Sequence, residues 1–191
     1  MSLEGLRIAV VDADGPLGAA AVAALREAGA SVAAVEVAKD GDATEGVDRA
    51  VAELGGLDVL ANLTVPREGA MPAIDVGRAD FDGIFKTCLR TARTSNQAAF
   101  RHMTAAGPGG HVVNHAEMAG ETGEAGRALA ATVAQATVAW SRATAGAWFM
   151  QGVRVNIFQP GAGADLSKTV IPTLLFLLSG DAALHGATVT C

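Results

Sequence analysis

A short apolar stretch that runs through a tight turn into an alanine-rich segment constrains the fold of this chain most. Residues Ile8–Val11 are apolar and mostly β-branched, which is typical of a parallel strand covered on both faces. A polar turn follows, and Pro16 then begins a segment that ends at Gly29. Proline suits the first helical position, and glycine suits the residue just past a helix end. Strand, turn and helix in this order predict the first unit of a doubly wound α/β fold with helices on both faces of a parallel sheet.

The same turn is a candidate seat for the diphosphate of a dinucleotide. Such a seat needs glycines, so that backbone N–H groups can approach the phosphates at the N-terminus of a helix. With Gly18 as the last glycine of the motif, the two earlier glycine positions hold Asp12 and Pro16. Proline has no N–H to donate, and aspartate brings a negative charge to an anion site. Two interpretations stay open: a helix capped by its own residues, or a usable nucleotide site. The candidate contacts are Asp14, Gly15, Leu17 and Gly18.

Composition and charge narrow the class of protein. The chain has 191 residues, half of them apolar, and a net charge of −6. We expect one domain, residues 1–191, with a substantial core. An acidic chain offers no basic face for phosphate backbones, so nucleic acid is excluded as a partner.

The cysteines and the longest apolar run suggest a compartment. Cys88 and Cys191 are the only cysteines and form neither a disulfide framework nor a metal motif, which indicates a reducing compartment. The run Val170–Leu178 contains Pro172 and is too short to span a bilayer. We therefore expect a cytoplasmic protein without membrane contact. No metal is expected either, since the histidines lack ligand spacing.

The rest of the chain alternates between strand and helix patterns. Residues 31–37 are predicted to form a second strand, and Glu36 near its end stands where an acid can bind a ribose hydroxyl. A solvated surface carboxylate is the equal alternative. Further strands are expected at 57–63, 111–115, 153–158 and 187–190, and helices at 47–54, 80–103, 127–149 and 167–178. The alternation predicts parallel strands with right-handed crossovers.

Four segments in order resemble the short-chain dehydrogenase/reductase family over nearly the whole chain. They are Asp58–Asn62, Gly109–Asn114, Arg154–Gly161, and Phe176–Ala182 followed by Gly186. The resemblance implies a Rossmann-like sheet and an oxidoreductase that uses NAD(P). Two segments are shorter than in the family: residues 36–47 leave no room for one helix and most of the third strand, and residues 161–167 leave little of the substrate-covering loop.

The resemblance also implies catalytic positions, and this chain fills them with other residues. The family uses a tyrosine with a lysine four residues on, a serine on the preceding loop and an asparagine in a long helix. The chain contains no tyrosine. The matching positions hold Cys88 for asparagine, Glu117 (or Ala116) for serine, Ala130 for tyrosine and Ala134 for lysine. The cofactor-contacting Asn-Ala-Gly segment begins here with Asn62, a further candidate contact, and continues with leucine and threonine.

His115 and Glu117 are the candidates for substitute chemistry. They lie at the carboxyl end of a predicted strand, where α/β sheets place their sites, and alternation points both side chains the same way if the strand extends as far as Glu117. A histidine with a carboxylate can act as an acid/base couple. The plain alternative is two solvated loop residues. Cys88 is expected to be a small buried side chain in a helix.

These observations predict a degenerate family member that lacks the catalytic residues and the glycine-rich motif. We expect a non-catalytic binding or scaffold protein with no cofactor, or NAD(H) if any. One alternative is an NAD(P)-dependent oxidoreductase with relocated catalytic groups. A second is a cofactor-free lyase, isomerase or hydrolase that uses His115 and Glu117. By resemblance, helices at 80–104 and 127–149 are expected to form a homodimer or homotetramer interface, with Trp140 and Trp148 on one face.

Overall fold

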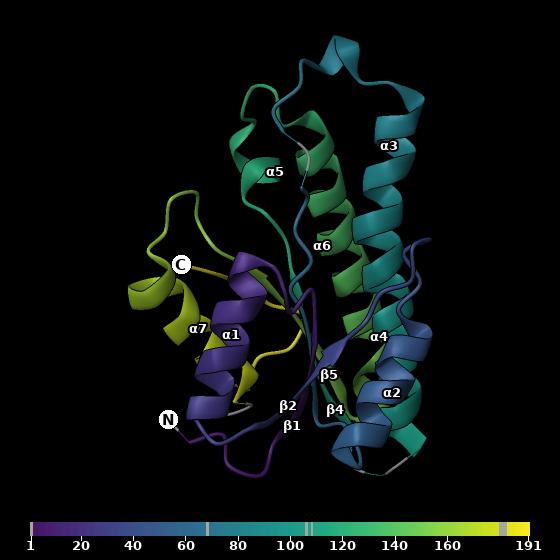
Figure 1. The fold of residues 1–191 in the computed structure, drawn as a ribbon, viewed down its shortest axis with the longest axis vertical. Coiled ribbons are helices and arrows are strands. Elements are labelled where there is room, and N and C mark those ends of the chain that lie inside the picture. The colour runs from purple at the N-terminus through teal and green to yellow at the C-terminus, as the bar shows by residue number, and fades with distance from the viewer. Residues whose placement is uncertain (1, 68, 106, 108, 180–182) are drawn as a thin grey trace.

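Six parallel strands form one sheet in the part of the chain that the structure describes (Figure 1). The computed structural model describes residues 2–67, 69–105, 107, 109–179 and 183–191. The strand order is β2-β1-β3-β4-β5-β6. The strands are β1 Arg7–Val11, β2 Ser31–Val35, β3 Val59–Asn62, β4 Gly110–His115, β5 Val153–Gln159 and β6 Thr188–Thr190. The predicted doubly wound α/β fold is confirmed.

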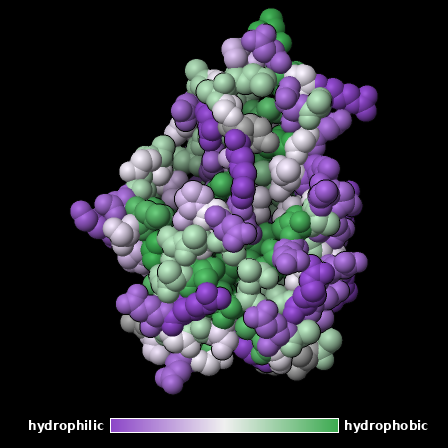
Figure 2. Space-filling model, viewed as in Figure 1, coloured by the Kyte–Doolittle hydropathy of each residue, from purple (hydrophilic) through white to green (hydrophobic). Residues whose placement is uncertain are grey.

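Helices cover both faces of this sheet, as Figure 1 shows. Helices α1 and α7 lie on one face, and α2, α4 and α6 lie on the other. The helices are α1 Pro16–Glu27, α2 Thr44–Leu54, α3 Arg78–Ile84, α4 Thr91–Ala105, α5 Ala119–Thr122, α6 Ala128–Trp148 and α7 Ile171–Leu178. Shorter helical turns are η1 Ala73–Asp75, η2 Phe85–Arg90, η3 Phe149–Gln151 and η4 Leu166–Val170. On the face drawn in Figure 2, apolar surface gathers around α1 and α7, while hydrophilic residues cover α2 and α3.

Strand β1 is buried on both of its faces, which explains why its residues are all apolar after Arg7. Ile8 and Val10 belong to the core under α1 and α7, whereas Ala9 and Val11 belong to the core under α2, α4 and α6. A strand buried on both faces reads as a continuous apolar run, and this is the pattern from which it was predicted.

Several boundaries differ from the prediction. Helix α2 begins at Thr44, three residues before the predicted start at Val47, and the short helix α5 lies between β4 and α6, where no helix was predicted. The predicted long helix at 80–103 corresponds to a helical run from Arg78 to Ala105. The run consists of α3, the π-helical turn η2 and α4, which follow one another without a gap. π-helical turns recur at functional sites, and η2 carries Cys88.

The shortened segment at 36–47 lacks the helix and the strand that the family has there, as expected. Strand β2 lies at the edge of the sheet, and the chain passes from it through a loop to α2 without another strand. The missing strand would extend an edge, so the remaining core is closed without it. Pro108 and the segment Gly180–Ala182 of the family resemblance lie outside the described residues. Within the described residues, none of the helices is both long and apolar enough to cross a bilayer.

Candidate functional site

A cavity of about 300 Å³ opens at the carboxyl edge of the sheet. Its walls come from the start of α1, from the segments that follow β3, β4 and β5, and from the start of η4. Ligands of doubly wound sheets bind in this crevice, outside the carboxyl ends of the strands where the connections change direction. The polar residues on its walls are His115, Glu117, Glu124 and Arg127. Most other lining residues are apolar, and they include Leu17, Val65, Pro160 and Val170.

The turn between β1 and α1 keeps the backbone shape of a glycine motif although two glycines are replaced. Asp12 has a φ of 61°, a left-handed conformation that glycine adopts most easily. A Cβ on Gly18 would lie 2.0 Å from the Asp12 carbonyl oxygen, so only glycine allows this approach of helix to strand end. Gly15 is the N-cap of α1, and Pro16 takes the first helical position as predicted.

The charge at this turn differs from that of a glycine cradle. The Asp12 carboxylate forms an ion pair with Arg67, which lies in the loop after β3. A Cβ on Gly15 would meet the Asp12 carboxylate at 3.1 Å, so the aspartate side chain lies over the turn. Asp14 is exposed. The turn therefore fits a diphosphate by its backbone shape and by the guanidinium of Arg67, and not through the three-glycine cradle.

Glu36 follows β2 directly and is exposed, as both sequence interpretations require. Its carboxylate accepts a hydrogen bond from Arg49 Nη2 at 2.8 Å. The position suits a ribose hydroxyl, and Leu17 stands on the wall of the cavity between the turn and the strand ends. The residues present thus fit the outline of a dinucleotide along the carboxyl edge.

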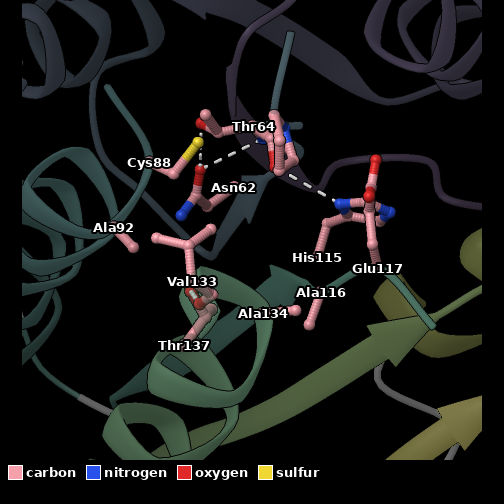
Figure 3. A pocket seen from close by; sticks show the side chains of 11 residues that line it. Asn62, Thr64, Cys88, Ala92, His115, Ala116, Glu117, Val133, Ala134 and Thr137 are labelled. Atoms are coloured by element: carbon pink, nitrogen blue, oxygen red, sulfur yellow. Dashed lines mark hydrogen bonds between the residues drawn. The ribbon is translucent and has the colours of Figure 1, made fainter. Parts of the chain in front are cut away.

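The positions of the family's catalytic residues do come together, with one exception. Cys88, Glu117 and Ala134 line one narrow cavity beside β3 and β4, and Figure 3 shows their side chains around it. The exception is Ala130, which lies one turn nearer the start of α6 and lines a different shallow cavity. Cys88 is buried, as expected, and packs with Ile84 and Val133. In the narrow cavity, Cys88 and Ala134, two small side chains, and the carboxylate of Glu117 therefore stand where the family places three members of its proton relay.

His115 is a titratable side chain at the junction of the carboxyl-edge cavity and the narrow cavity. It is the last residue of β4, it is only 6% exposed, and it lines both cavities. Its Nδ1 lies 3.3 Å from the carbonyl oxygen of Thr64, a contact drawn in Figure 3. A carbonyl can only accept, so Nδ1 carries the proton and Nε2 holds a lone pair. Burial lowers the pKa of His115 to about 4, against the smaller raising effect of the Thr64 hydrogen bond, so the ring is neutral at pH 7.

Glu117 reaches the same cavity walls but is engaged elsewhere. Its carboxylate forms an ion pair with Arg127, the residue that precedes α6, and the two side chains are only 21% and 24% exposed. The predicted histidine–carboxylate couple is therefore not a hydrogen-bonded pair: the described partner of His115 is Thr64, and that of Glu117 is Arg127. Strand β4 ends at His115, so strand alternation does not extend to Glu117, and the sequence pattern did not indicate the arginine.

A buried chain of amides holds the strand ends beneath the site. Asn62 Nδ2 donates to Asn114 Oδ1 at 3.2 Å, and Asn114 Nδ2 donates to Ser141 Oγ at 3.0 Å. Asn62 Oδ1 also accepts from the Thr64 hydroxyl at 2.7 Å. Asn62 is thus a neighbour of the narrow cavity whose amide bonds to protein groups, and it fixes the Thr64 segment that orients His115.

The remaining histidines stand apart from these cavities. His102 pairs with Asp48 on the surface, and His111 is buried at the other end of β4. The described residues contain no cluster of three or more histidine, cysteine or acidic side chains that could hold a metal ion.

Comparison with known proteins identifies the family. Residues 1–179 match the family profile described as enoyl-(acyl carrier protein) reductase. The chain belongs to the short-chain dehydrogenase/reductase family. Sorbitol dehydrogenase of Cereibacter sphaeroides is 31% identical over 164 residues, which are 83% of this chain and 61% of that protein. The 2-dehydro-3-deoxy-D-gluconate 5-dehydrogenase of Escherichia coli (strain K12) is 27% identical, over 84% of this chain and 72% of its own length. This member of the family therefore spans less than two thirds of that sorbitol dehydrogenase.

Solved structures of the short-chain dehydrogenase/reductase family share the fold. A short-chain dehydrogenase from Burkholderia cenocepacia J2315, in complex with NADP, has a TM-score of 0.88 and 24% identity, with 100% of this chain and 97% of that chain covered. At this identity the likeness establishes the fold alone.

The comparisons correct the main functional prediction. A non-catalytic scaffold was expected because the family's catalytic residues and glycine motif are replaced. That prediction is wrong: the matching proteins are named as dehydrogenases and the family profile as a reductase, which supports the alternative of an NAD(P)-dependent oxidoreductase. The reason for the error is that vacant positions were equated with lost function, whereas the fold still forms a cavity at the carboxyl edge.

Two arginines of the site were missed by the sequence reasoning. Arg67 and Arg127 pair with the carboxylates of Asp12 and Glu117. Each stands in a loop, and the segments 64–77 and 116–127 each contain only this one basic residue. A search for the counter-ion of each candidate carboxylate would have suggested them.

Proposed function

We propose that this chain is an NAD(P)-dependent short-chain oxidoreductase with a relocated proton-transfer group, and that it interconverts a small alcohol and its carbonyl compound. Membership of a family of named dehydrogenases supports the reaction class. The observation that supports the proposal most directly is a buried, neutral histidine on the wall of the carboxyl-edge cavity.

His115 takes the role of the base in alcohol oxidation. Thr64 holds Nδ1 as the donor, which leaves the Nε2 lone pair to accept the hydroxyl proton of a bound alcohol. A nicotinamide cofactor, when bound, supplies the hydride acceptor. The apolar walls exclude water around the alcohol carbon, and the Glu117–Arg127 pair holds the cavity rim. In the reverse direction, a protonated His115 returns the proton to the carbonyl oxygen.

NAD(H) is the cofactor that the charges favour. The carboxylate of Glu36 can accept hydrogen bonds from the ribose hydroxyls of NAD. The same negative charge repels the 2′-phosphate that NADP carries in place of one hydroxyl. Arg67 lies beside the proposed diphosphate site. When the cofactor binds, its guanidinium would leave the carboxylate of Asp12 and bind phosphate oxygens. Leu17 and Gly18 at the start of α1, and Asn62 beneath the loop after β3, are the remaining contacts in this proposal.

The chain acts in this proposal as one domain over residues 1–191, in the cytoplasm, and as a homo-oligomer through helices 80–104 and 127–149. The packing of Trp148 on Phe100, with ring centroids 4.5 Å apart, joins α6 to α4. This contact supports a shared surface of the two helices.

The test is the oxidation of a panel of small secondary alcohols with NAD+ and with NADP+. The rate is measured from the absorbance of the reduced nicotinamide that forms. We expect turnover with NAD+, and a loss of about 100- to 10,000-fold in kcat/KM for His115→Phe, which is the usual worth of a general base. His102→Phe is the matched control, because His102 lies at the surface beside Asp48.

Two outcomes would contradict the proposal. Turnover that survives His115→Phe would remove the histidine from the mechanism. Absence of any nucleotide-dependent turnover, together with no thermal shift by NAD(H) or NADP(H), would reject the oxidoreductase itself, because saturation at about 100 times Kd stabilises a fold by about 2.7 kcal/mol.

A further inference from the structure

A further cavity, of about 260 Å³, opens at the opposite, amino edge of the sheet. It lies among the starts of β3, β4 and β5 and the end of α7, away from the residues of the proposed active site. His111, Arg154 and Asp58 are the titratable side chains on its walls. Its size suits a ligand smaller than a typical cofactor.

The protonation of His111 follows from the orientation of its neighbour Asn156. Asn156 Oδ1 accepts from the Ala187 N–H at 3.1 Å, and Asn156 Nδ2 donates to the Leu184 carbonyl at 2.9 Å. These two backbone bonds fix which end of the amide is nitrogen. The same Nδ2 lies 2.9 Å from His111 Nε2 and must donate to it. Nε2 is therefore the acceptor, and the proton of the neutral ring resides on Nδ1.

The resulting Nδ1–H is a buried donor without a protein partner among the described residues. His111 is 2% exposed, and its Nδ1 makes no hydrogen bond to a protein group. Burial, with the charge of Arg154 and with His185, lowers the pKa of His111 to about 3, so the ring is neutral at pH 7. A buried donor left unsatisfied costs on the order of 1–3 kcal/mol, so such a group calls for an acceptor.

Arg154 brings positive charge to the same place. It is the direct register partner of His111 on the neighbouring strand, so both side chains leave the sheet on the same face. The carboxylate on the cavity wall, Asp58, is bonded by Arg7 through Nη2 at 2.7 Å and through Nε at 2.9 Å. The negative charge of Asp58 is thus balanced by Arg7.

We propose that the cavity at the amino edge binds a small oxyanion, held by the His111 Nδ1–H and the Arg154 guanidinium. Phosphate and carboxylate oxygens accept both kinds of hydrogen bond, and a guanidinium binds them in a forked geometry. The site lies at the other end of β4 from His115 and does not depend on the oxidoreductase proposal.

The experiment uses inorganic phosphate and acetate as probes of the whole chain. In protein labelled with 15N-histidine, we expect a protonated Nδ1 and an unprotonated Nε2 for His111, and a saturable shift of the Nδ1–H resonance on titration with at least one probe. Calorimetry then gives Kd, and the stronger probe distinguishes a phosphate site from a carboxylate site. A hydrogen bond to a charged group predicts a loss of about 10- to 100-fold in affinity for His111→Phe.

Arg154→Gln provides a second variant in case His111→Phe does not fold, and it is expected to weaken binding at least as much. His102→Phe is the control and is expected to bind like the wild type. Binding of both probes that is unchanged in the two variants, or an Nδ1–H resonance that neither probe moves at saturating concentration, would overturn the proposal. These outcomes leave the alcohol oxidation test unaffected.

Discussion

Among single residues, the two histidines at the ends of β4 differ most in what they are prepared to do. His111 and His115 are both buried, and burial lowers the pKa of each, to about 3 and about 4. Each ring has one nitrogen whose role is fixed: Asn156 makes Nε2 of His111 an acceptor, and Thr64 makes Nδ1 of His115 a donor. The same residue type is thereby prepared as a donor at one edge of the sheet and as a base at the other.

These two pKa values predict how stability depends on pH. In the unfolded chain a histidine binds a proton below about pH 6.5, whereas in the folded chain the two rings stay neutral down to about pH 4 and pH 3. The stabilisation is therefore complete above about pH 6.5 and declines as the pH falls toward the folded values. Each histidine contributes a slope of up to about 1.4 kcal/mol per pH unit in the free energy of unfolding.

Urea unfolding at a series of pH values from neutral down toward the folded pKa of His115 measures this slope. We expect His115→Phe to reduce the slope of the free energy of unfolding against pH by up to about 1.4 kcal/mol per pH unit, the contribution of one histidine. Thr137→Val, a change at a buried residue of the same narrow cavity that carries no charge, should leave the slope as it is. Parallel curves for wild type and His115→Phe would show that the ring of His115 is protonated in the folded state.

Among the secondary-structure elements, the turn between β1 and α1 depends on one glycine more than on the motif. Gly18 packs against the Asp12 carbonyl. Asp12 keeps the left-handed φ in place of a glycine, because aspartate adopts this conformation more readily than most residues, and Pro16 begins the helix. The backbone of the turn therefore keeps its shape while its charge is changed.

Glycine-to-alanine substitutions separate close packing from helix propensity. A Cβ at Gly18 would lie 2.0 Å from a carbonyl oxygen, so Gly18→Ala is expected to destabilise by about 1–3 kcal/mol, the usual cost of overpacking. Gly146 lies on the exposed side of α6, where an added Cβ would meet no atom within 4 Å, so Gly146→Ala should stabilise by about 0.5–1 kcal/mol. Thermal unfolding of both variants measures the change in stability, which should be negative for Gly18→Ala and positive for Gly146→Ala. A stabilising effect of both substitutions would contradict the close packing at Gly18.

For the molecule as a whole, helix α6 leaves a face of small residues open to solvent. Ala139, Ala143, Gly146 and Ala147 are exposed on it. Large side chains, Phe149 and Met150, follow at its end and are 58% and 85% exposed. A face of small residues lets a second helix approach closely, which agrees with the proposed contact through helices 80–104 and 127–149.

Sedimentation of the purified chain tests this surface. We expect the wild type to sediment as a dimer or tetramer and Ala143→Arg to sediment at the mass of one chain, because a buried unpaired charge is strongly unfavourable. Ala19→Arg, at an exposed position of α1, is the control and should keep the wild-type assembly. A wild type that is monomeric at all concentrations would reject the interface.

The fold could be predicted from the order of residues alone, because hydrophobic periodicity and turn residues act locally. The apolar run at Ile8–Val11, Pro16 at the start of α1 and the alternation of strands and helices follow from neighbours along the chain, and the order of segments then indicated the family. The same local rules drew attention to His115 and Glu117 at the carboxyl end of a predicted strand. They misjudged the function, since replaced residues at known positions say nothing of what other segments bring to the site.

The partners of the charged and polar side chains, by contrast, emerged only from the folded molecule. Arg67 and Arg127 meet Asp12 and Glu117 from other segments, and Asn156 determines which nitrogen of His111 is protonated. Such pairings join residues as far as 55 positions apart, so the periodicity of the chain, which relates near neighbours, does not specify them. A hydrogen bond or an ion pair depends on distances of a few ångströms, and these distances exist only after the sheet has brought the strand ends together.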